Sequence, residues 1–544
     1  MGEGDDIRNR ELLSQCDHRA PRGQEQIAAD ALSGLGLAQI DEDAEEPSLE
    51  AFIQAVPNSN TEHSTLRSYW SSARSAYRER PRLQPQREFI PLEPNSIRNE
   101  EENTMKTILK PGSIAFGFGL MLTTLGQAQP GAPSGTPLSF KVPPHAMSAI
   151  SFSAAPNVQC SVAPANGSGS GQAFTVYTND EGTATFYVTP SEESSAAQLV
   201  ATCSSGNQQT IEIQPVAGAK PLVAPAPSNA ATNARLGYTV RPALTGDPMA
   251  LSNQELVKRK YPVRPDPQKA PGAYASWLKA VSKPATFIPP KTVNVEGPSQ
   301  HPAKISADAS TGPYPYDSPY WSGYLLYTGV NQKPFVWIEG DWNVPALVAG
   351  EDGTTTASIL GIGFDGFAGT HVVAAGTGQS ALLQGGILYV SYVPLAWIVD
   401  QEQLVISNFT INPGDEIYGE VWMGDSLENF NPNGGYANFY LHDLTTGQST
   451  YLLTPFYGIF AGISAEWIME RSSNNGGYSD LADYSYAVMR SAWAYTYDGN
   501  YVNYQVAPFG GLSYQITMYN GNDILSSVYP IDSDTMEFIW QNFH

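Results

Sequence analysis

Residues 314–544 consist of short segments in which apolar and polar side chains alternate, separated by turns rich in glycine, asparagine and aspartate. In one segment Ile417, Val421 and Met423 share a face, directly after the turn Pro413-Gly414. Alternation with a period of two is typical of β-strands that bury one face. Many such strands predict an all-β fold class, a large antiparallel β-sandwich, for this region.

Composition excludes several classes of protein. A chain of 544 residues exceeds what one hydrophobic core usually supports, so we expect more than one unit. The net charge of −24 disfavours nucleic-acid binding, because phosphate contacts need Lys and Arg. No apolar run is long enough for a stable membrane span. Three cysteines and scattered histidines predict no metal site, and nothing in the sequence calls for a cofactor.

The N-terminal region changes character at Met105. Residues 1–104 are polar and of mixed charge, and all their basic residues are arginine, which predicts a disordered upstream extension. Residues 105–128 have a basic head, an apolar run and small residues that end at Ala128, the layout of a signal peptide. A weak internal anchor is the alternative. With the leader 129–136, this arrangement predicts a secreted or periplasmic protein.

Residues 137–216 are predicted to form a small immunoglobulin-like β-sandwich, an accessory module. A hairpin is expected around Asp180-Glu181-Gly182, because apolar residues alternate on both sides of that turn. Cys160 and Cys203 form an even pair in a chain with an export signal, which favours a disulfide. Two buried free thiols are the alternative.

Residues 217–313 are rich in proline and basic side chains, with helices expected over 252–260 and 273–281. Between residues 235 and 304 the net charge is about +7, whereas residues 314–544 carry about −20. The opposite charges predict that this segment acts as an intramolecular, propeptide-like basic cover on the C-terminal region.

Several motifs of the C-terminal region occur in a characteristic order and spacing. They are Trp321-Ser322-Gly323-Tyr324, Gly340-Asp341-Trp342-Asn343-Val344-Pro345, Gly363-Phe364-Asp365-Gly366, Leu444-Thr445-Thr446-Gly447-Gln448-Ser449 and Ala465-Glu466-Trp467-Ile468-Met469-Glu470. This set resembles the eqolisins, the glutamic peptidases. Upstream, Arg264-Pro265-Asp266-Pro267 and Tyr274-Ala275-Ser276-Trp277-Leu278 resemble the segment that precedes the catalytic domain in bacterial members. The likeness covers about residues 234–541.

The resemblance implies a concanavalin-like β-sandwich that hydrolyses peptide or protein substrates at acid pH with a Glu and a Gln. Glu470 matches the family's Glu, the general base that takes a proton from the attacking water. The Gln amide would donate to the oxyanion. Asp365, Trp321 and Trp467 are the candidate substrate-binding residues, although core packing is an alternative for each tryptophan.

The sequence departs from the family at the second catalytic position. The family's Gln precedes a Gly by two positions, and the residue in that place here is Ala374, which has no donor. Gln379 and Gln384 lie near by, and either is a candidate for a substitute amide. The prediction is a glutamic-peptidase-like protein with weak or lost peptide hydrolysis.

Glu470 can also be considered without the family. On a strand, Glu466, Ile468 and Glu470 share a face, and about 13 Å separates the two carboxylates, so Glu470 needs a partner from another strand. Without the motif, both acids would be read as solvated surface positions. A glycosidase would need a second carboxylate about 5–9.5 Å away, with Glu339, Asp365 and Glu420 as candidates. A noncatalytic or carbohydrate-binding sandwich therefore stays open as the alternative.

Overall fold

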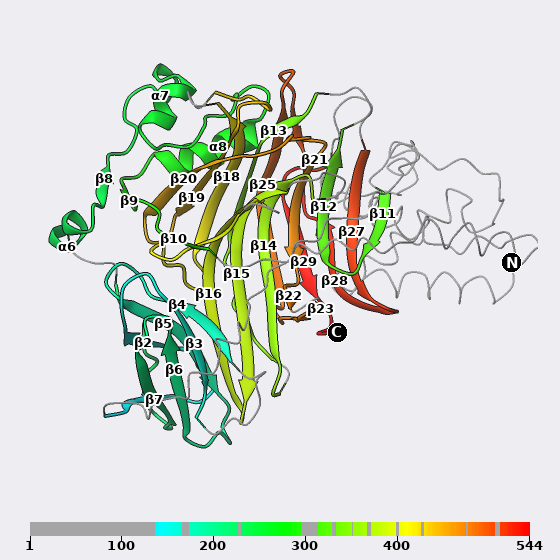
Figure 1. Ribbon diagram of the computed structural model, residues 1–544. Coiled ribbons are helices and arrows are strands. Elements are labelled where there is room, and N and C mark those ends of the chain that lie inside the picture. The colour runs from blue at the N-terminus through cyan, green and yellow to red at the C-terminus, as the bar shows by residue number, and fades with distance from the viewer. Residues whose placement is uncertain are drawn as a thin grey trace, which may run out of the picture. The chain divides into compact units, whose positions relative to one another are not determined.

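The computed structural model describes residues 136–165, 173–226, 230–294, 314–328, 333–350, 352–366, 372–398, 402–425, 429–474, 477–505 and 512–544. The predicted extension 1–104, the predicted signal peptide 105–128, nearly all of the leader 129–136 and residues 295–313 lie outside these ranges. Within them the chain is nearly all β, as predicted (Figure 1). No helix in the described part of the chain combines the length and apolar character that crossing a membrane requires.

Residues 136–216, here called the upstream β part, contain one complete sheet with the strand order β1-β7-β6-β3-β4. The predicted disulfide is confirmed, because Cys160 of β3 is bonded to Cys203 of β6. These two strands are direct neighbours in the sheet, whereas an immunoglobulin disulfide joins two sheets. The immunoglobulin-like label therefore stays a prediction. The strands are β1 (Leu138–Val142), β2 (Ser148–Ser153), β3 (Gln159–Pro164), β4 (Phe174–Tyr177), β5 (Thr183–Pro190), β6 (Ala197–Cys203) and β7 (Gln208–Pro215).

The upstream β part shares its second layer with the C-terminal region. β5 pairs with β2 on one side and, through residues 187–190, with β16 (Ile387–Ile398) on the other. Leu382, Ile387 and Tyr389 accordingly belong to the core of the upstream β part. The hairpin expected around Asp180 is formed only at its turn, where the Asn179 amide donates to the Thr183 carbonyl. β4 and β5 belong to different sheets and meet at the single bridge Thr178–Ala184, because β5 takes its partners elsewhere.

Residues 217–294, here called the connecting segment, contain both predicted helices. α7 (Asn253–Lys258) begins after Ser252, whose hydroxyl accepts from the Glu255 backbone while the Glu255 carboxylate accepts from the Ser252 backbone. α8 (Pro271–Val281) buries Trp277. The other elements are α6 (Ala230–Arg235), β8 (Thr239–Arg241), the 3₁₀ turn η1 (Pro248–Ala250), β9 (Ala285–Phe287) and β10 (Thr292–Asn294).

Residues 314–544 form the C-terminal sandwich, which has two layers. The first layer has the order β11-β27-β12-β21-β14-β15-β16-β17-β10, and the second has β9-β20-β19-β18-β13-β25-β29-β28. The bounds are β11 (Tyr314–Ser318), β12 (Trp321–Tyr327), β13 (Phe335–Asn343), β14 (Thr355–Phe364), β15 (Val373–Gln384), β17 (Glu402–Ile406), β18 (Glu416–Gly424), β19 (Tyr436–Asp443), β20 (Gln448–Pro455), β21 (Ser464–Glu470), β25 (Tyr486–Thr496), β27 (Leu512–Asn520), β28 (Asp523–Pro530) and β29 (Met536–Trp540). Short strands complete the set: β22 (Ser473–Asn474), β23 (Gly477–Tyr478), β24 (Asp480–Leu481) and β26 (Tyr501–Asn503).

The main core lies between the two layers and contains Ile417, Val421 and Met423, on the face predicted from their alternation. The outer face of the first layer carries a second apolar cluster, to which Trp321, Ile359 and Ile468 belong. The outer face of the second layer is rich in aromatic side chains and is covered by the connecting segment. Each layer therefore has its own outer face, and a catalytic or binding site could lie on either of them.

Candidate active site

Glu470 is the last residue of β21, in the middle of the first layer. Its register partners are Trp321 on β12 and Ile359 on β14, and Ile359 is in turn opposite Gly378 on β15. Paired residues of an antiparallel sheet point to the same face, so these side chains share the outer face with Glu470. The carboxyl is fully buried, and neither oxygen has a hydrogen-bond partner among the described atoms.

This environment favours the neutral form of Glu470. Burial raises its pKa well above the usual value, and the nearby carboxylate of Glu466 raises it further. Glu466 itself accepts hydrogen bonds from the Ser464 hydroxyl at 2.6 Å and the Gly366 amide at 3.1 Å. A protonated carboxyl is a poor general base in the acid range, although it can donate a proton.

Ala374 lies on the same outer face as Glu470, in the row that contains Gly363 and Glu466. Four residues of β15, about 13 Å, separate Ala374 from the Glu470 row. Between them β14 and β15 contribute Gly361 and Gly376. A Cβ at either position would come within 2.6 Å of a backbone oxygen of the facing strand, so both positions require glycine. These two strands therefore place no side chain between Ala374 and the Glu470 row.

The two candidate substitute amides do not approach Glu470. Gln379 is opposite Ser358 and points to the inner face of the first layer, where neither its amide oxygen nor its nitrogen has a partner among the described atoms. Gln384 ends β15, six residues and about 20 Å beyond Gly378. The structure thus brings neither glutamine close to Glu470.

The three candidate substrate-binding residues have different surroundings. Trp321 neighbours Glu470 and is 4% exposed. Trp467 points to the inner face, where its indole donates to the Glu339 carbonyl at 2.8 Å, so it packs in the main core. Asp365 is buried and accepts from the amides of Gly462 and Ile463, each at 2.7 Å. Burial raises its pKa to about 6. Asp365 therefore fixes the loop that leads into β21.

The second layer holds a pair of buried carboxyls, Glu339 on β13 and Glu420 on β18, which are direct register partners. The Tyr418 hydroxyl lies 2.8 Å from Glu339 Oε2 and 2.6 Å from Glu420 Oε1. Because one hydroxyl has one proton, a second proton on a carboxyl is needed for both contacts to be hydrogen bonds. Burial raises the pKa of Glu420 to about 8, and burial and Glu420 raise that of Glu339 well above its usual value.

This pair is not a partner for Glu470. Glu339 and Glu420 lie on the outer face of the second layer, whereas Glu470 lies on the outer face of the first. The alternation that placed Ile417 and Val421 in the main core also places Tyr418, Glu420 and Trp422 together on the opposite face. That pattern was present in the sequence. The pairing with Glu339 was not, because it depends on strand register.

The connecting segment covers this second face. The Val263 amide donates to Glu420 Oε2 at 2.9 Å, and Lys279 forms an ion pair with Glu416. Arg241 is buried, donates to the Tyr440 hydroxyl at 3.0 Å and also contacts the Ser449 hydroxyl. Its guanidinium lies 4.6 Å from the centre of the Tyr261 ring. Within the described ranges no group of three or more His, Cys, Asp and Glu side chains is arranged to hold a metal ion.

The C-terminal region is thus a two-layer β-sandwich with a buried glutamate on the outer face of one layer. Residues 319–538 match the model of the Peptidase A4 family, the eqolisins, and this part of the chain is similar to that family. The resemblance stated from the motifs is confirmed.

Two solved structures are also reported as similar to this chain. A scytalido-glutamic peptidase with a transition state analog inhibitor has 19% sequence identity, and the match covers 41% of this chain and 98% of that one with a TM-score of 0.33. SCP-B, described as a member of the eqolisin family of peptidases in complex with the tripeptide Ala-Ile-His, has 18% identity, the same coverage and a TM-score of 0.30. A search of curated proteins gives no match.

Proposed function

We propose that the C-terminal sandwich is a glutamic-peptidase-like domain with an altered catalytic pair, whose peptide hydrolysis is weak or lost. One observation carries the proposal. On the face that holds Glu470, the position matched to the family's Gln is Ala374, and the register partners nearest to Glu470 are Trp321, Ile359 and Gly378. None of these side chains is an amide.

This arrangement disfavours two steps of peptide hydrolysis, the stabilisation of the tetrahedral intermediate and the activation of water. The tetrahedral intermediate of peptide hydrolysis carries a negative oxygen, and removing one donor to such an oxygen costs about 2.7–4 kcal/mol, a hundred- to a thousandfold in rate. Glu470 must also lose a proton to activate water, and its burial opposes that loss at acid pH. A peptide could still be held on this face without being cut.

The proposal is tested by hydrolysis of an unstructured protein substrate at pH 2–5 with the purified chain and its Glu470→Gln variant. We expect little cleavage by either protein. Rapid cleavage by the natural chain that disappears in Glu470→Gln would show that an active pair exists and would overturn the altered-pair proposal. Rapid cleavage that survives in Glu470→Gln would place the chemistry at another site.

We also propose that the connecting segment is a propeptide-like partner that stays bound to the sandwich. Its contacts support this, because Val263 and Arg241 are both buried against the second layer and Lys279 adds an ion pair. The described part of the segment covers the aromatic face of the second layer. The test needs a chain that has been cut between the connecting segment and the sandwich. Acid treatment of this cut chain, followed by size-exclusion chromatography, shows whether the segment dissociates. We expect it to remain attached at pH 5–7.

A further inference from the structure

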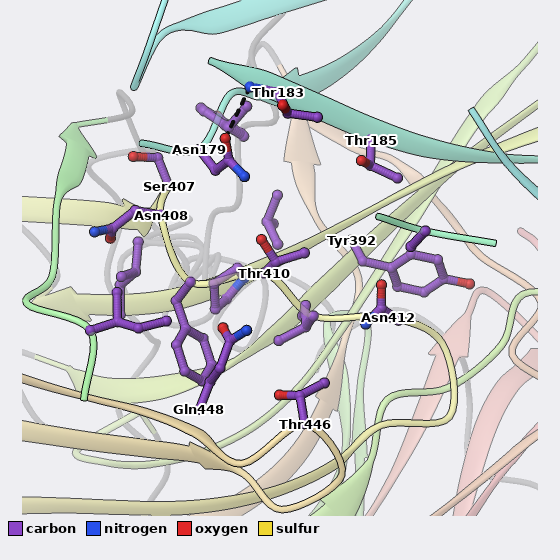
Figure 2. A pocket seen from close by; sticks show the side chains of 18 of the residues that line it. Asn179, Thr183, Thr185, Tyr392, Ser407, Asn408, Thr410, Asn412, Thr446 and Gln448 are labelled. Carbon is purple, nitrogen blue, oxygen red and sulfur yellow. Dashed lines mark hydrogen bonds between the residues drawn. The ribbon is translucent and has the colours of Figure 1, made fainter. Parts of the chain in front are cut away.

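A pocket lies where the upstream β part meets the C-terminal sandwich, and Glu470 is not among its lining residues. β5 and β17 pair with the same edge of β16, β5 with residues 387–390 and β17 with residues 395–398. Residues 391–394 lie between these two ladders, and the pocket forms there. Residues 405–412 and the turn before β20 also line it (Figure 2). The connecting segment contributes further lining residues, among them Tyr238 and Ile288. Its volume is about 150 Å³, less than the 300–1,000 Å³ of sites for drug-sized molecules.

The wall of the pocket is polar and almost uncharged. Figure 2 shows amide and hydroxyl side chains from both parts of the chain around it. Among the described lining residues Glu181 alone carries a formal charge, although the sandwich around the pocket is strongly acidic. The polar members include Asn179, Thr183, Ser391, Thr410, Thr446 and Gln448. Such a wall offers no cation for an anionic ligand and no cluster of carboxylates for a cationic one.

Several of these polar groups have no protein partner within the described part of the chain. Ser391 is 3% exposed and Gln448 8% exposed, yet neither side chain makes a hydrogen bond there. Buried polar groups in native proteins are normally hydrogen-bonded. Because Ser391 and Gln448 both line the pocket, a bound molecule or water is what can satisfy them.

Other polar groups are held in fixed orientations by the protein. The Asn179 side-chain oxygen accepts from the Thr183 amide at 2.9 Å, which leaves the Asn179 amide nitrogen for another acceptor (Figure 2). Asn408 donates to Asp180 at 3.0 Å and to the Pro289 carbonyl at 2.9 Å. Asn412 donates to Asp415 at 2.8 Å. Side chains fixed before binding lose less conformational entropy when a ligand binds. The Asn408 amide only shapes the wall, because both its hydrogens and its oxygen are used within the protein.

We propose that this pocket binds one or two rings of a neutral saccharide. A sugar ring presents many hydroxyls that both donate and accept, which matches a wall of amides and hydroxyls without charge. Tyr187, Tyr392 and Phe409 also line the pocket and supply apolar surface for the C–H groups of a ring. Tyr187 and Tyr392 pack edge to face with their ring centres 5.4 Å apart, and this contact fixes the position of both rings.

An extended peptide fits the site less well. Peptides that add to a sheet use a row of free backbone groups along an edge strand. The stretch of β16 between its two partner strands is residues 391–394, and Pro394 has no amide proton to donate. Side-chain groups therefore dominate the recognition surface, and these suit a hydroxylated ring.

The experiment titrates the full purified chain with cellotriose, maltotriose, xylotriose and chitotriose by calorimetry and saturation-transfer NMR at neutral pH. We expect saturable binding of at least one of them. Gln448→Ala and Ser391→Ala should each weaken that binding about 2- to 12-fold, the effect of losing one neutral hydrogen bond. Thr410→Ala, at an exposed pocket residue where folding is not at risk, should weaken it similarly. The matched control Gln198→Ala, at an exposed position of β6, should leave it unchanged.

Three results would overturn the proposal. The first is that none of the four trisaccharides binds at millimolar concentration. The second is that binding occurs but is equal in the natural chain and in Gln448→Ala, Ser391→Ala and Thr410→Ala, which would place it elsewhere. The third is that the peptide Ala-Ala-Ala binds and is lost in Ser391→Ala, which would identify a peptide site.

Discussion

Glu470 and Ala374 lie on the same outer face of the first layer with one row of residues between their rows, and β14 and β15 contribute only glycine to that intervening row. The space across β14 and β15 that a catalytic pair would share is therefore open at backbone level. What the face lacks is a donor, since Ala374 ends at a methyl group. A single side-chain replacement at this buried position therefore tests the chemistry directly, provided that the variants are matched for volume.

We predict that Ala374→Gln raises peptide hydrolysis at acid pH about a hundred- to a thousandfold over the natural chain, because it supplies the missing oxyanion donor. Initial rates on a denatured protein substrate at pH 3–4 check this. The double variant Ala374→Gln/Glu470→Gln should return to the natural rate. Ala374→Leu is the matched control for volume, because it fills similar space without a donor. Equal rates in the Gln and Leu variants would contradict the prediction.

Local features of the fold could be predicted from the sequence, whereas pairings distant in the sequence could not. The capping box of Ser252 and Glu255 involves residues three apart, and the helix expected there is formed. The strand face of Glu466, Ile468 and Glu470 follows from alternation alone, and the structure agrees. Both features depend on a few consecutive residues.

The two failures have a common physical cause. β5 was expected to pair with β4, but its partners are β2 and β16, and the β16 strand lies about two hundred residues further along the chain. Glu339 and Glu420 were considered as partners of Glu470, but strand register pairs them with each other. Register is set by contacts between distant strands, and a one-residue change moves every side chain to the other face. A single sequence does not contain that information in readable form.

We predict that reducing the Cys160–Cys203 disulfide, or replacing both residues by alanine, lowers the free energy of unfolding by about 4 kcal/mol. The two residues are 43 apart, and the disulfide stabilises by restricting that loop in the unfolded chain. Urea unfolding of the oxidised and reduced protein, followed by near-ultraviolet circular dichroism, measures the difference. Cys16 lies outside this loop, so Cys16→Ala is the matched control and should leave the oxidised protein unchanged.

We predict that Arg241→Ala loosens the connecting segment. The side chain joins the segment to the Tyr440 and Ser449 hydroxyls of the second layer, and a hydrogen bond from a charged group contributes about 1.5–3 kcal/mol. Hydrogen exchange measured by mass spectrometry should become about ten- to a hundredfold faster in peptides from 252–281. Arg235→Ala, at an exposed arginine of the same segment, is the control. Unchanged exchange in both variants would show that Arg241 does not hold the segment.

We predict that export begins at Met105 and that the mature chain starts at Gln129, after cleavage behind Ala128. The basic head, apolar run and small residues of 105–128 are the reason, and a disulfide is typical of exported proteins. Mass spectrometry of the protein recovered outside the cell checks this. Mature protein that still contains peptides from 1–104 would contradict it. Ala128→Trp should block the cleavage and leave the signal attached.

The last prediction concerns the pair Glu339 and Glu420, which should make the folded chain less stable as pH rises. Burial raises the pKa of Glu420 from 4.5 to about 8, so between these values the folded protein holds a proton that the unfolded chain has released. The state that binds more protons is favoured at low pH. The contribution is therefore fully present below pH 4.5 and is lost as pH rises through about 8, with a slope of up to about 1.4 kcal/mol per pH unit.

Glu420→Gln should flatten this dependence, because an amide does not ionise. Its oxygen can still accept from the Val263 amide, and its nitrogen can donate to the Tyr418 hydroxyl oxygen instead of accepting from it. Urea unfolding at pH 5, 6, 7 and 8 provides the comparison. Asp341 and Asp365, with pKa values of about 6, and Asp443, at about 7, act in the same direction and are present in both proteins. The difference between the two curves therefore isolates Glu420 and should grow with pH up to about 8. If the curves stay parallel from pH 5 to pH 8, the pair does not hold the proton that its geometry requires.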